Sequence, residues 1–172
     1  AALQSGDRIA ALRGGEPAIP PATGLRGAMR VLDALVRWYA QPPQEDAGLT
    51  EALEHAQRLL RPGAQLVVLA DAGSAARVPV LRWTALARHH QATLVLLQDP
   101  LETTPPKREL AFLAAGRRLQ LALDRSGVRE RWEHAFMDPA RELSRTLPAL
   151  GWQVRLLATD AGARDVEYEL VR

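Results

Sequence analysis

The chain has 172 residues, of which 47% are apolar and 24% charged, so its length and composition suit one globular domain, expected over residues 1–172. It has no cysteine, which excludes disulfides and thiolate metal sites and fits a cytoplasmic location, and no apolar run approaches the roughly 20 residues of a membrane span. The formal net charge is +2, and arginines alternate with acids along the chain rather than clustering, so we expect no binding to nucleic acid.

The N-terminal part of the chain predicts a short strand followed by a helix. Asp7–Arg13 has the composition of a strand, and the prolines of Pro17–Pro21 indicate an extended connection after it. In Gly24–Ala40, apolar residues recur at helical spacing and arginines take the opposite side, which predicts an amphipathic helix. Its apolar side consists of Leu25, Met29, Leu32, Val36 and Tyr39.

The middle of the chain predicts two strands, each preceded by a helix. Gly48–Arg61 and Pro79–His90 have the apolar spacing of helices. Gln65–Ala70 and Ala92–Gln98 are almost continuously apolar, which is typical of parallel strands that are buried on both faces. This alternation predicts an α/β fold of three layers, in which a mainly parallel sheet has helices on both faces.

The remainder of the chain predicts further elements of the same kind. Asp138-Pro139 is expected to interrupt a helix, because Asp is a good N-cap and Pro a good first helical residue. Gly151 is expected to cap the helical region that precedes it. In chain order we expect a loop at Asp99–Arg108, a strand at Arg118–Leu123, helical turns on both sides of Asp138, a strand at Trp152–Leu157, and a short strand or helix at Tyr168–Arg172.

Familiar catalytic motifs do not account for the chain. It lacks the G-x-G-x-x-G and P-loop patterns that hold nucleotide phosphates, and Gly73-Ser74 does not lie in the G-x-S-x-G pattern of a serine hydrolase. His89 and His90 are adjacent, so they point to different sides of a helix and cannot chelate together. We therefore expect a protein that is not an enzyme.

Polar residues gather instead at one predicted edge of the sheet. Asp71 and Asp99 each follow an apolar strand, where open α/β sheets bind ligands, and Thr50 lies in the first turn of a helix. A carboxylate and a hydroxyl suit a hard cation such as Mg²⁺, although two protein oxygens alone would bind it weakly. From spacing alone the preferred interpretation is structural, with Thr50 capping its helix and Asp71 a loop. Asp99 would likewise cap a turn, and Glu102 would pair with a surface arginine.

Five short stretches carry a family resemblance through their order and spacing. They are Ser5-Gly6-Asp7-Arg8, Gly48-Leu49-Thr50 with Ala52-Leu53, Leu66 to Asp71 after Arg61-Pro62-Gly63, Leu86 to His90, and Asp99-Pro100-Leu101-Glu102. Together they resemble the bacterial domain-of-unknown-function family that is similar to von Willebrand factor A domains. The genes of that family often lie beside those of MoxR-type AAA+ ATPases. The resemblance covers residues 5–159.

This resemblance implies a metal-ion-dependent adhesion site at the carboxyl edge of the strands. Thr50 and Asp71 look like the threonine and the aspartate that hold Mg²⁺ there, which reverses the preference for a structural interpretation. The D-x-S-x-S loop of such a site would precede Ala1–Leu3, which look like the end of the helix after that loop. The chain does not begin with methionine, and we expect it to be a piece of a longer protein. The strands that flank the missing strand are then expected to leave backbone groups unpaired.

Two functions follow as hypotheses. The first is a non-enzymatic module that binds a protein partner, in a metal-dependent mode implied by the resemblance. It would act with a MoxR-type AAA+ ATPase in the assembly or maturation of another protein. The alternative is a Mg²⁺-dependent phosphoryl transferase or hydrolase that uses Asp71, Asp99 and Glu102. Members of the family often carry transmembrane segments upstream of this region, which leaves open whether the longer protein is anchored in a membrane.

Overall fold

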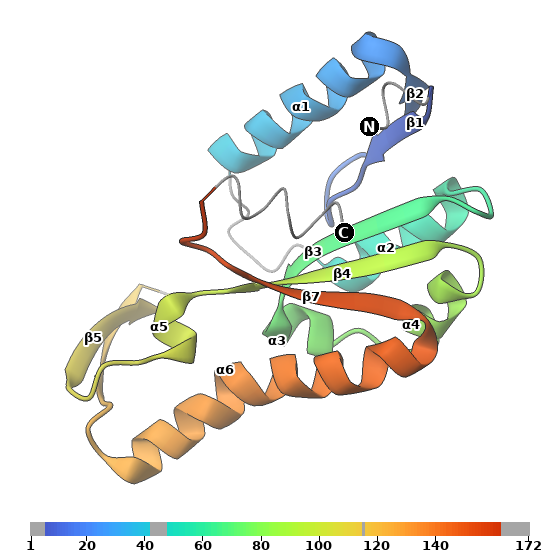
Figure 1. The fold of residues 1–172 in the computed structure, drawn as a ribbon. Helices are drawn as coiled ribbons and strands as arrows, with labels where there is room; N and C mark the ends of the chain where they lie inside the picture. Colours follow the sequence, from blue (N-terminus) through green and yellow to red (C-terminus); the bar gives the residue numbers. More distant parts are fainter. Residues whose placement is uncertain (1–5, 42–47, 115, 163–172) are drawn as a thin grey trace.

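A computed structural model of the chain describes residues 6–41, 48–114 and 116–162, and Figure 1 shows its fold. Three strands, β3 (Gln65–Asp71), β4 (Gln91–Gln98) and β7 (Trp152–Ala158), form a parallel sheet in the order β3-β4-β7. The predicted α/β class and parallel sheet are therefore confirmed. Within the described residues, no helix is long and apolar enough to cross a membrane. The predictions for Ala1–Leu3 and Tyr168–Arg172 fall outside this part of the chain.

Most helices of the fold pack against one face of the parallel sheet. Alternate strand residues, among them Val68 and Leu94, form the core together with buried side chains of these helices. The rings of Trp83 and Trp152 meet edge to face in this core, with centroids 4.8 Å apart, and Nε1 of Trp152 donates to the carbonyl of Trp83 at 2.9 Å. The helices concerned are α2 (Leu49–Leu59), α3 (Ala72–Ala76), α4 (Val80–Ala87), α6 (Ser126–Thr146) and a 3₁₀ helix at Leu147–Leu150.

The opposite face of the sheet departs from the prediction. Val67 and Leu69 of β3 are 41% and 56% exposed, whereas Val95 of the central strand is fully buried. The strand residues that pack against the described helices all lie on one face of the sheet. The predicted helices on both faces are therefore not found in this part of the chain. The prediction that Gln65–Ala70 is buried on both faces was wrong. An apolar run does not reveal whether its strand lies at the centre or at the edge of a sheet.

The N-terminal strands form a hairpin of their own. β1 (Arg8–Ala11) pairs antiparallel with β2 (Ile19–Thr23), and neither joins a ladder with β3 among the described strands. The prediction of a plain connection at Pro17–Pro21 was wrong for its last three residues, which lie in β2. Proline is tolerated there because β2 is an edge strand that need not donate on both sides.

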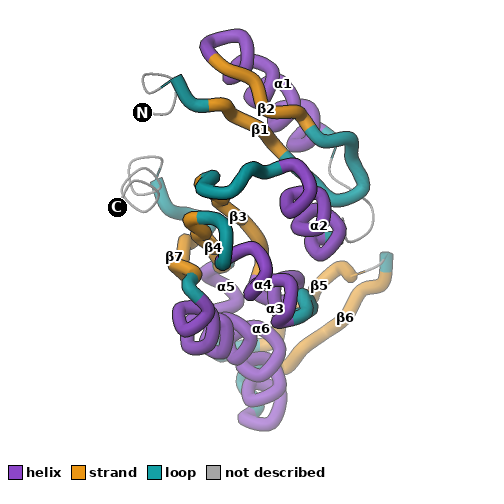
Figure 2. The backbone as a smooth tube through the Cα atoms, turned by 90° about the vertical axis from the view of Figure 1, so that its right-hand side faces the viewer, coloured by secondary structure: helices purple, strands orange, loops and turns teal. Residues whose placement is uncertain are grey.

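Helix α1 (Gly24–Ala40) has the predicted bounds, and it packs on the hairpin as Figure 2 shows. Gly27 and Ala34 are buried, and a Cβ on Gly27 would lie 2.6 Å from the carbonyl oxygen of Ala22, so the contact requires glycine. These small residues face the hairpin, and the predicted apolar side therefore points away from it, contrary to the expectation of burial. The exposed side chains of that side, between 54% and 90% exposed, are Leu25, Met29, Leu32, Val36 and Tyr39.

The segment between β4 and α6 contains more regular structure than predicted. The loop expected at Asp99–Arg108 includes a short helix, α5 (Pro100–Thr103). Strand β5 (Glu109–Ala114) was not predicted, and it pairs antiparallel with β6 (Arg117–Ala122), which the sequence did predict. Alternation of apolar residues is weak in β5, so its pairing partner rather than its own pattern defines it.

Helix α6 runs through Pro139 without interruption, contrary to the prediction. A proline inside a helix costs about 3 kcal/mol. Buried residues on both sides of it, Trp132 before and Ala140 and Leu143 after, hold the helix against the rest of the molecule. Gly151, with a φ of 92°, ends the helical region as predicted.

Candidate functional site

The parallel register of β3 and β4 brings two of the predicted site residues to one edge of the sheet. Asp71 is the last residue of β3 and is aligned with Leu97, two residues before Asp99. Both aspartates are exposed. This is the carboxyl edge, at which open α/β sheets bind their ligands. The structure thus places Asp71 and Asp99 where the sequence predicted them.

Asp71 has a structural task at this edge. Its Oδ1 accepts a hydrogen bond from the backbone N–H of Ser74 at 2.7 Å and so caps α3. Such a cap contributes about 1 kcal/mol to the stability of a helix. Asp71 caps the segment that follows it, as predicted, but that segment is the short helix α3 rather than the expected loop. The cap engages one of the two carboxylate oxygens.

Asp99 and Glu102 form a reciprocal cap at the start of α5. Oδ1 of Asp99 accepts from the backbone N–H of Leu101 at 2.7 Å, and Oε2 of Glu102 accepts from the backbone N–H of Asp99 at 3.4 Å. Pro100 suits the first position of this helix because it has no N–H to satisfy. The predicted cap at Asp99 is confirmed. The carboxylate of Glu102 meets this backbone group, and no arginine pairs with it among the described residues.

The environment of Glu102 links the three carboxylates. Its half-buried position raises the pKa of Glu102, because burial penalises the charged form. The hydrogen bond from the backbone of Asp99 opposes this shift, while the negative charges of Asp99 and Asp71 add to it. Asp71 and Asp99 therefore both lie near enough to Glu102 for their charges to act on it.

Thr50 lies in the first turn of α2, as predicted, but it does not cap the helix. The N-cap is Gly48, which makes no side-chain cap bond and adopts a φ of 66°. Thr50 is half-buried. The capping interpretation of Thr50 was therefore wrong, and its hydroxyl is not committed to the helix end.

Asp71 and Thr50 carry the oxygen atoms that a hard cation prefers, without a full ligand set. Mg²⁺ is commonly held by one or two carboxylates while it keeps several waters, and Asp71 with Thr50 would supply one carboxylate and one hydroxyl. In the part of the chain that the structure describes, no group of three or more His, Cys, Asp or Glu side chains is placed to hold a metal. The assignment of Thr50 and Asp71 as metal ligands stays a prediction.

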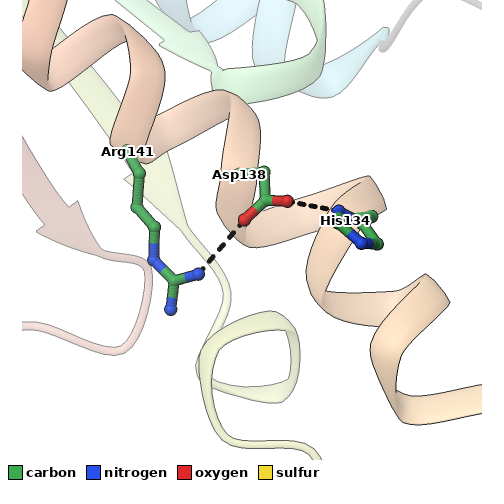
Figure 3. A network of polar contacts seen from close by, with 3 residues as sticks. All are labelled: His134, Asp138 and Arg141. Carbon is green, nitrogen blue, oxygen red and sulfur yellow. Dashed lines mark hydrogen bonds and ion pairs between the residues drawn. The ribbon is translucent and has the colours of Figure 1, made fainter.

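A groove that the sequence did not reveal lies between α4 and α6. Its volume is about 550 Å³, and its lining combines apolar side chains such as Trp83 and Leu143 with His134 and Asp138. Asp138 stands between two partners, as Figure 3 shows: Oδ2 meets Nδ1 of His134, and Oδ1 accepts from Arg141 at 3.1 Å. In the sequence, these contacts are indicated by the spacing of His134, Asp138 and Arg141, which lie four and three positions apart on one helix.

The polar network of this groove is explained by helix stability. Both pairs join residues three or four positions apart on α6, and all three side chains are substantially exposed. Exposed pairs of this kind contribute roughly 0.3–0.5 kcal/mol each. The acidic edge formed by Asp71, Asp99 and Glu102 therefore remains the candidate site.

Comparison with protein families matches residues 1–142, from the N-terminus into α6, to the family described as Protein of unknown function DUF58. Neither the curated proteins nor the solved structures contain a match to the chain. The match to the family covers most of the chain, including Thr50, the acidic edge and α1. The chain therefore belongs to the family of proteins of unknown function DUF58.

Proposed function

We propose that the chain is a non-enzymatic protein-binding module of the von Willebrand factor A-like type. In this proposal it works with a MoxR-type AAA+ ATPase in the assembly or maturation of another protein. The observation that carries the proposal is the apolar side of α1, which the fold leaves exposed. Exposed apolar patches of this extent typically mark surfaces that bind other proteins.

The composition of α1 supports this reading because the helix is apolar on two opposite sides. One side rests on the hairpin through Gly27 and Ala34. The other carries large side chains, including Leu32 and Val36, that contact no described element closely enough to be buried. A helix of a monomeric domain needs one apolar side, so the second side is available for a partner.

Binding of a purified MoxR-type ATPase to the chain tests the protein-binding proposal. The double variant Leu32→Glu/Val36→Glu places two charges on the exposed side of α1, and we expect it to weaken binding at least tenfold, measured by calorimetry. Leu81→Glu is the matched control, because Leu81 is an exposed leucine of α4, at 83% exposure, away from α1. Equal binding by the double variant and the wild type would contradict the proposal.

The metal part of the proposal assigns Mg²⁺ to Thr50 and Asp71, with Asp99 close by. Its support is that Thr50 does not cap α2 and that the charges of Asp71 and Asp99 both act on Glu102 at the carboxyl edge. We expect Mg²⁺ to raise the melting temperature relative to EDTA, and Thr50→Ala and Asp71→Asn to abolish that difference. Asparagine retains the helix cap, so Asp71→Asn separates metal binding from capping. A melting temperature that is the same in Mg²⁺ and EDTA would remove the metal from the proposal.

The enzymatic alternative rests on the same carboxylates. A raised pKa beside other acids is a feature of general acids, and Glu102 has one next to Asp99 and Asp71. A panel of phosphatase and esterase substrates separates the two functions. Turnover that Asp71→Asn abolishes would favour a hydrolase or phosphoryl transferase over a binding module.

A further inference from the structure

The β5–β6 hairpin projects from one end of the molecule, beyond the carboxyl ends of the parallel strands, as Figure 1 and Figure 2 show. It lies away from the outer edge of β3. One face of the hairpin is anchored to α6, because the rings of Phe112 and Trp132 lie 5.4 Å apart between centroids. Phe112 is aligned with Leu119, and residues 113 and 116–118 lie beyond this contact toward the turn. The end of the hairpin therefore extends past its support on α6.

The hairpin concentrates the positive charge of the chain. Residues 107–122 carry four basic side chains and one acidic side chain, a net charge of +3, whereas the whole chain has a net charge of +2. All four cations are exposed, and none of them forms an ion pair within the described residues: Lys107, Arg108, Arg117 and Arg118. No acidic residue lies between Glu109 and Asp124. The end of the hairpin is therefore electropositive and attracts an anionic partner.

Apolar side chains lie beside the arginines on both faces of this end. Directly opposed residues of an antiparallel pair share a face, and successive residues of a strand alternate between faces. Leu113, which is 80% exposed, is aligned with Arg118 and shares its face. Leu119, which is 48% exposed, lies on the other face with Phe112 and Arg117. Each face thus combines an exposed leucine with an arginine.

We infer that the end of the β5–β6 hairpin enters the headgroup region of a membrane that contains anionic lipids. Arg117 and Arg118 meet lipid phosphates, while the leucines reach the apolar boundary below them, as basic and apolar side chains do at membrane interfaces. The inference goes beyond the proposed binding of a protein and does not depend on it.

The distribution of the side chains favours a membrane over other anionic partners. A headgroup layer surrounds a projecting end and so covers Leu113 and Leu119 together, although they lie on opposite faces. A protein surface that docks on one face leaves the other leucine in water. Nucleic acid offers phosphates to the arginines but no apolar phase to the leucines.

Vesicle flotation of the 172-residue chain tests the role of charge. We expect binding to vesicles of equimolar phosphatidylcholine and phosphatidylglycerol, and little binding to phosphatidylcholine alone. Added salt is expected to weaken the binding, because it screens exposed charges. The double variant Arg117→Glu/Arg118→Glu is expected to bind about tenfold more weakly or less, since basic residues near an anionic surface supply the attraction. Arg117→Lys/Arg118→Lys keeps the charge and is expected to keep the binding.

The matched control for this charge reversal is Arg61→Glu/Arg88→Glu. These exposed arginines precede β3 and β4, at the opposite end of the parallel sheet from the hairpin. The control changes the net charge of the chain by the same amount. We expect it to weaken vesicle binding much less, because the position of the charge and not only its sum decides the attraction.

Fluorescent labels test entry into the membrane. The chain has no cysteine, so a single introduced cysteine carries a single dye. Leu113→Cys and Leu119→Cys place the environment-sensitive dye nitrobenzoxadiazole on opposite faces of the hairpin. With anionic vesicles we expect the emission of both labels to rise and shift to the blue. The label of Leu81→Cys, at an exposed position of α4, is expected to stay unchanged.

Undiminished vesicle binding of the Arg117→Glu/Arg118→Glu chain would overturn the inference, as would no binding of the wild type to anionic vesicles. A response of only one of the two hairpin labels would also overturn it, because it would show docking by one face. Tighter binding to duplex DNA than to vesicles, lost in the same glutamate variant, would instead assign the hairpin to nucleic acid. If the glutamate variant fails to fold, as measured by its melting temperature, the two labels decide.

Discussion

Each of the three carboxylates at the acidic edge is either a helix cap or the partner of one. Asp71 caps α3, Asp99 caps α5, and Glu102 accepts from the backbone N–H of Asp99. Short polar side chains after a strand serve this purpose in many proteins, so capping explains their positions without a ligand. Burial raises the pKa of Glu102, the hydrogen bond from the backbone N–H of Asp99 opposes that rise, and the charges of Asp99 and Asp71 act in the same direction as burial. A bound cation, as proposed, would offset these two charges.

The substitution Glu102→Gln tests how much the charge of Glu102 lowers the stability of the folded chain. Folding raises the pKa of Glu102 above its ordinary value of 4.5, so its contribution to stability is complete below that pH and is lost as the pH rises through the raised pKa. Glutamine retains the capping acceptor without the charge. We expect the variant to match the wild type near pH 4 and to exceed its stability at pH 7 by no more than about 1 kcal/mol, because the site is partly exposed. Urea denaturation across this range provides the measurement, and a less stable variant at pH 7 would contradict the argument.

At the scale of elements, α1 buries the side of the helix with small residues and leaves the side with large apolar residues exposed. The hairpin selects the side with Gly27 and Ala34, because small residues allow the backbones to approach closely. The large apolar side, which periodicity identifies more strongly, then faces outward. The orientation of the helix is therefore decided by shape at one contact, and its exposed side becomes the proposed binding surface.

Replacement of Gly27 by alanine tests this contact. The added Cβ would meet the backbone of Ala22 at 2.6 Å, and a backbone atom cannot move aside as a flexible side chain can. We expect Gly27→Ala to destabilise the chain by about 1–3 kcal/mol in urea denaturation. Gly127→Ala in α6 is the matched control, since a Cβ there meets nothing within 4 Å, and it is expected to stabilise by roughly 0.4–1 kcal/mol. Equal effects of the two substitutions would show that α1 does not depend on the close contact.

At the scale of the whole molecule, the two tryptophans of the core connect helix and sheet. Trp83 belongs to α4 and Trp152 begins β7, 69 residues later, and the hydrogen bond between them is buried. A buried indole N–H needs an acceptor, so this bond fixes the position of α4 against the end of the sheet. The contact is long-range and joins the middle of the chain to its last described strand.

The substitution Trp152→Phe measures the value of this connection. Phenylalanine fills part of the space but cannot donate to the carbonyl of Trp83, so a hydrogen bond of about 1 kcal/mol and some packing are lost. We expect a total loss of about 2–4 kcal/mol in thermal or urea denaturation. Trp38→Phe, at a half-buried position of α1, is expected to cost less than about 1 kcal/mol. A Trp152→Phe variant as stable as the wild type would contradict the structural role of the bond.

The comparison of sequence and structure separates local from long-range information. Spacing predicted the bounds of α1, the starts of β4 and β7 to within one residue, and the caps at Asp71 and Asp99, because these depend on residues a few positions apart. It missed β5, which exists through its pairing with β6, and it placed a break at Pro139 that the packing of α6 overrides. Thr50 was correctly placed in the first turn of its helix, but the prediction that it caps the helix was wrong, since the N-cap is Gly48.

By itself, the sequence determined the α/β class, the parallel strands and the placement of Asp71 and Asp99 at one sheet edge, because hydrophobic period and strand direction are local properties that add up along the chain. Only the tertiary structure decided that β3 lies at the edge of the described sheet, that α1 turns its large apolar side outward, and that Asp71 and Asp99 act on Glu102. Burial depends on which elements meet, and a strand with an apolar run reads the same at the centre of a sheet as at its open edge.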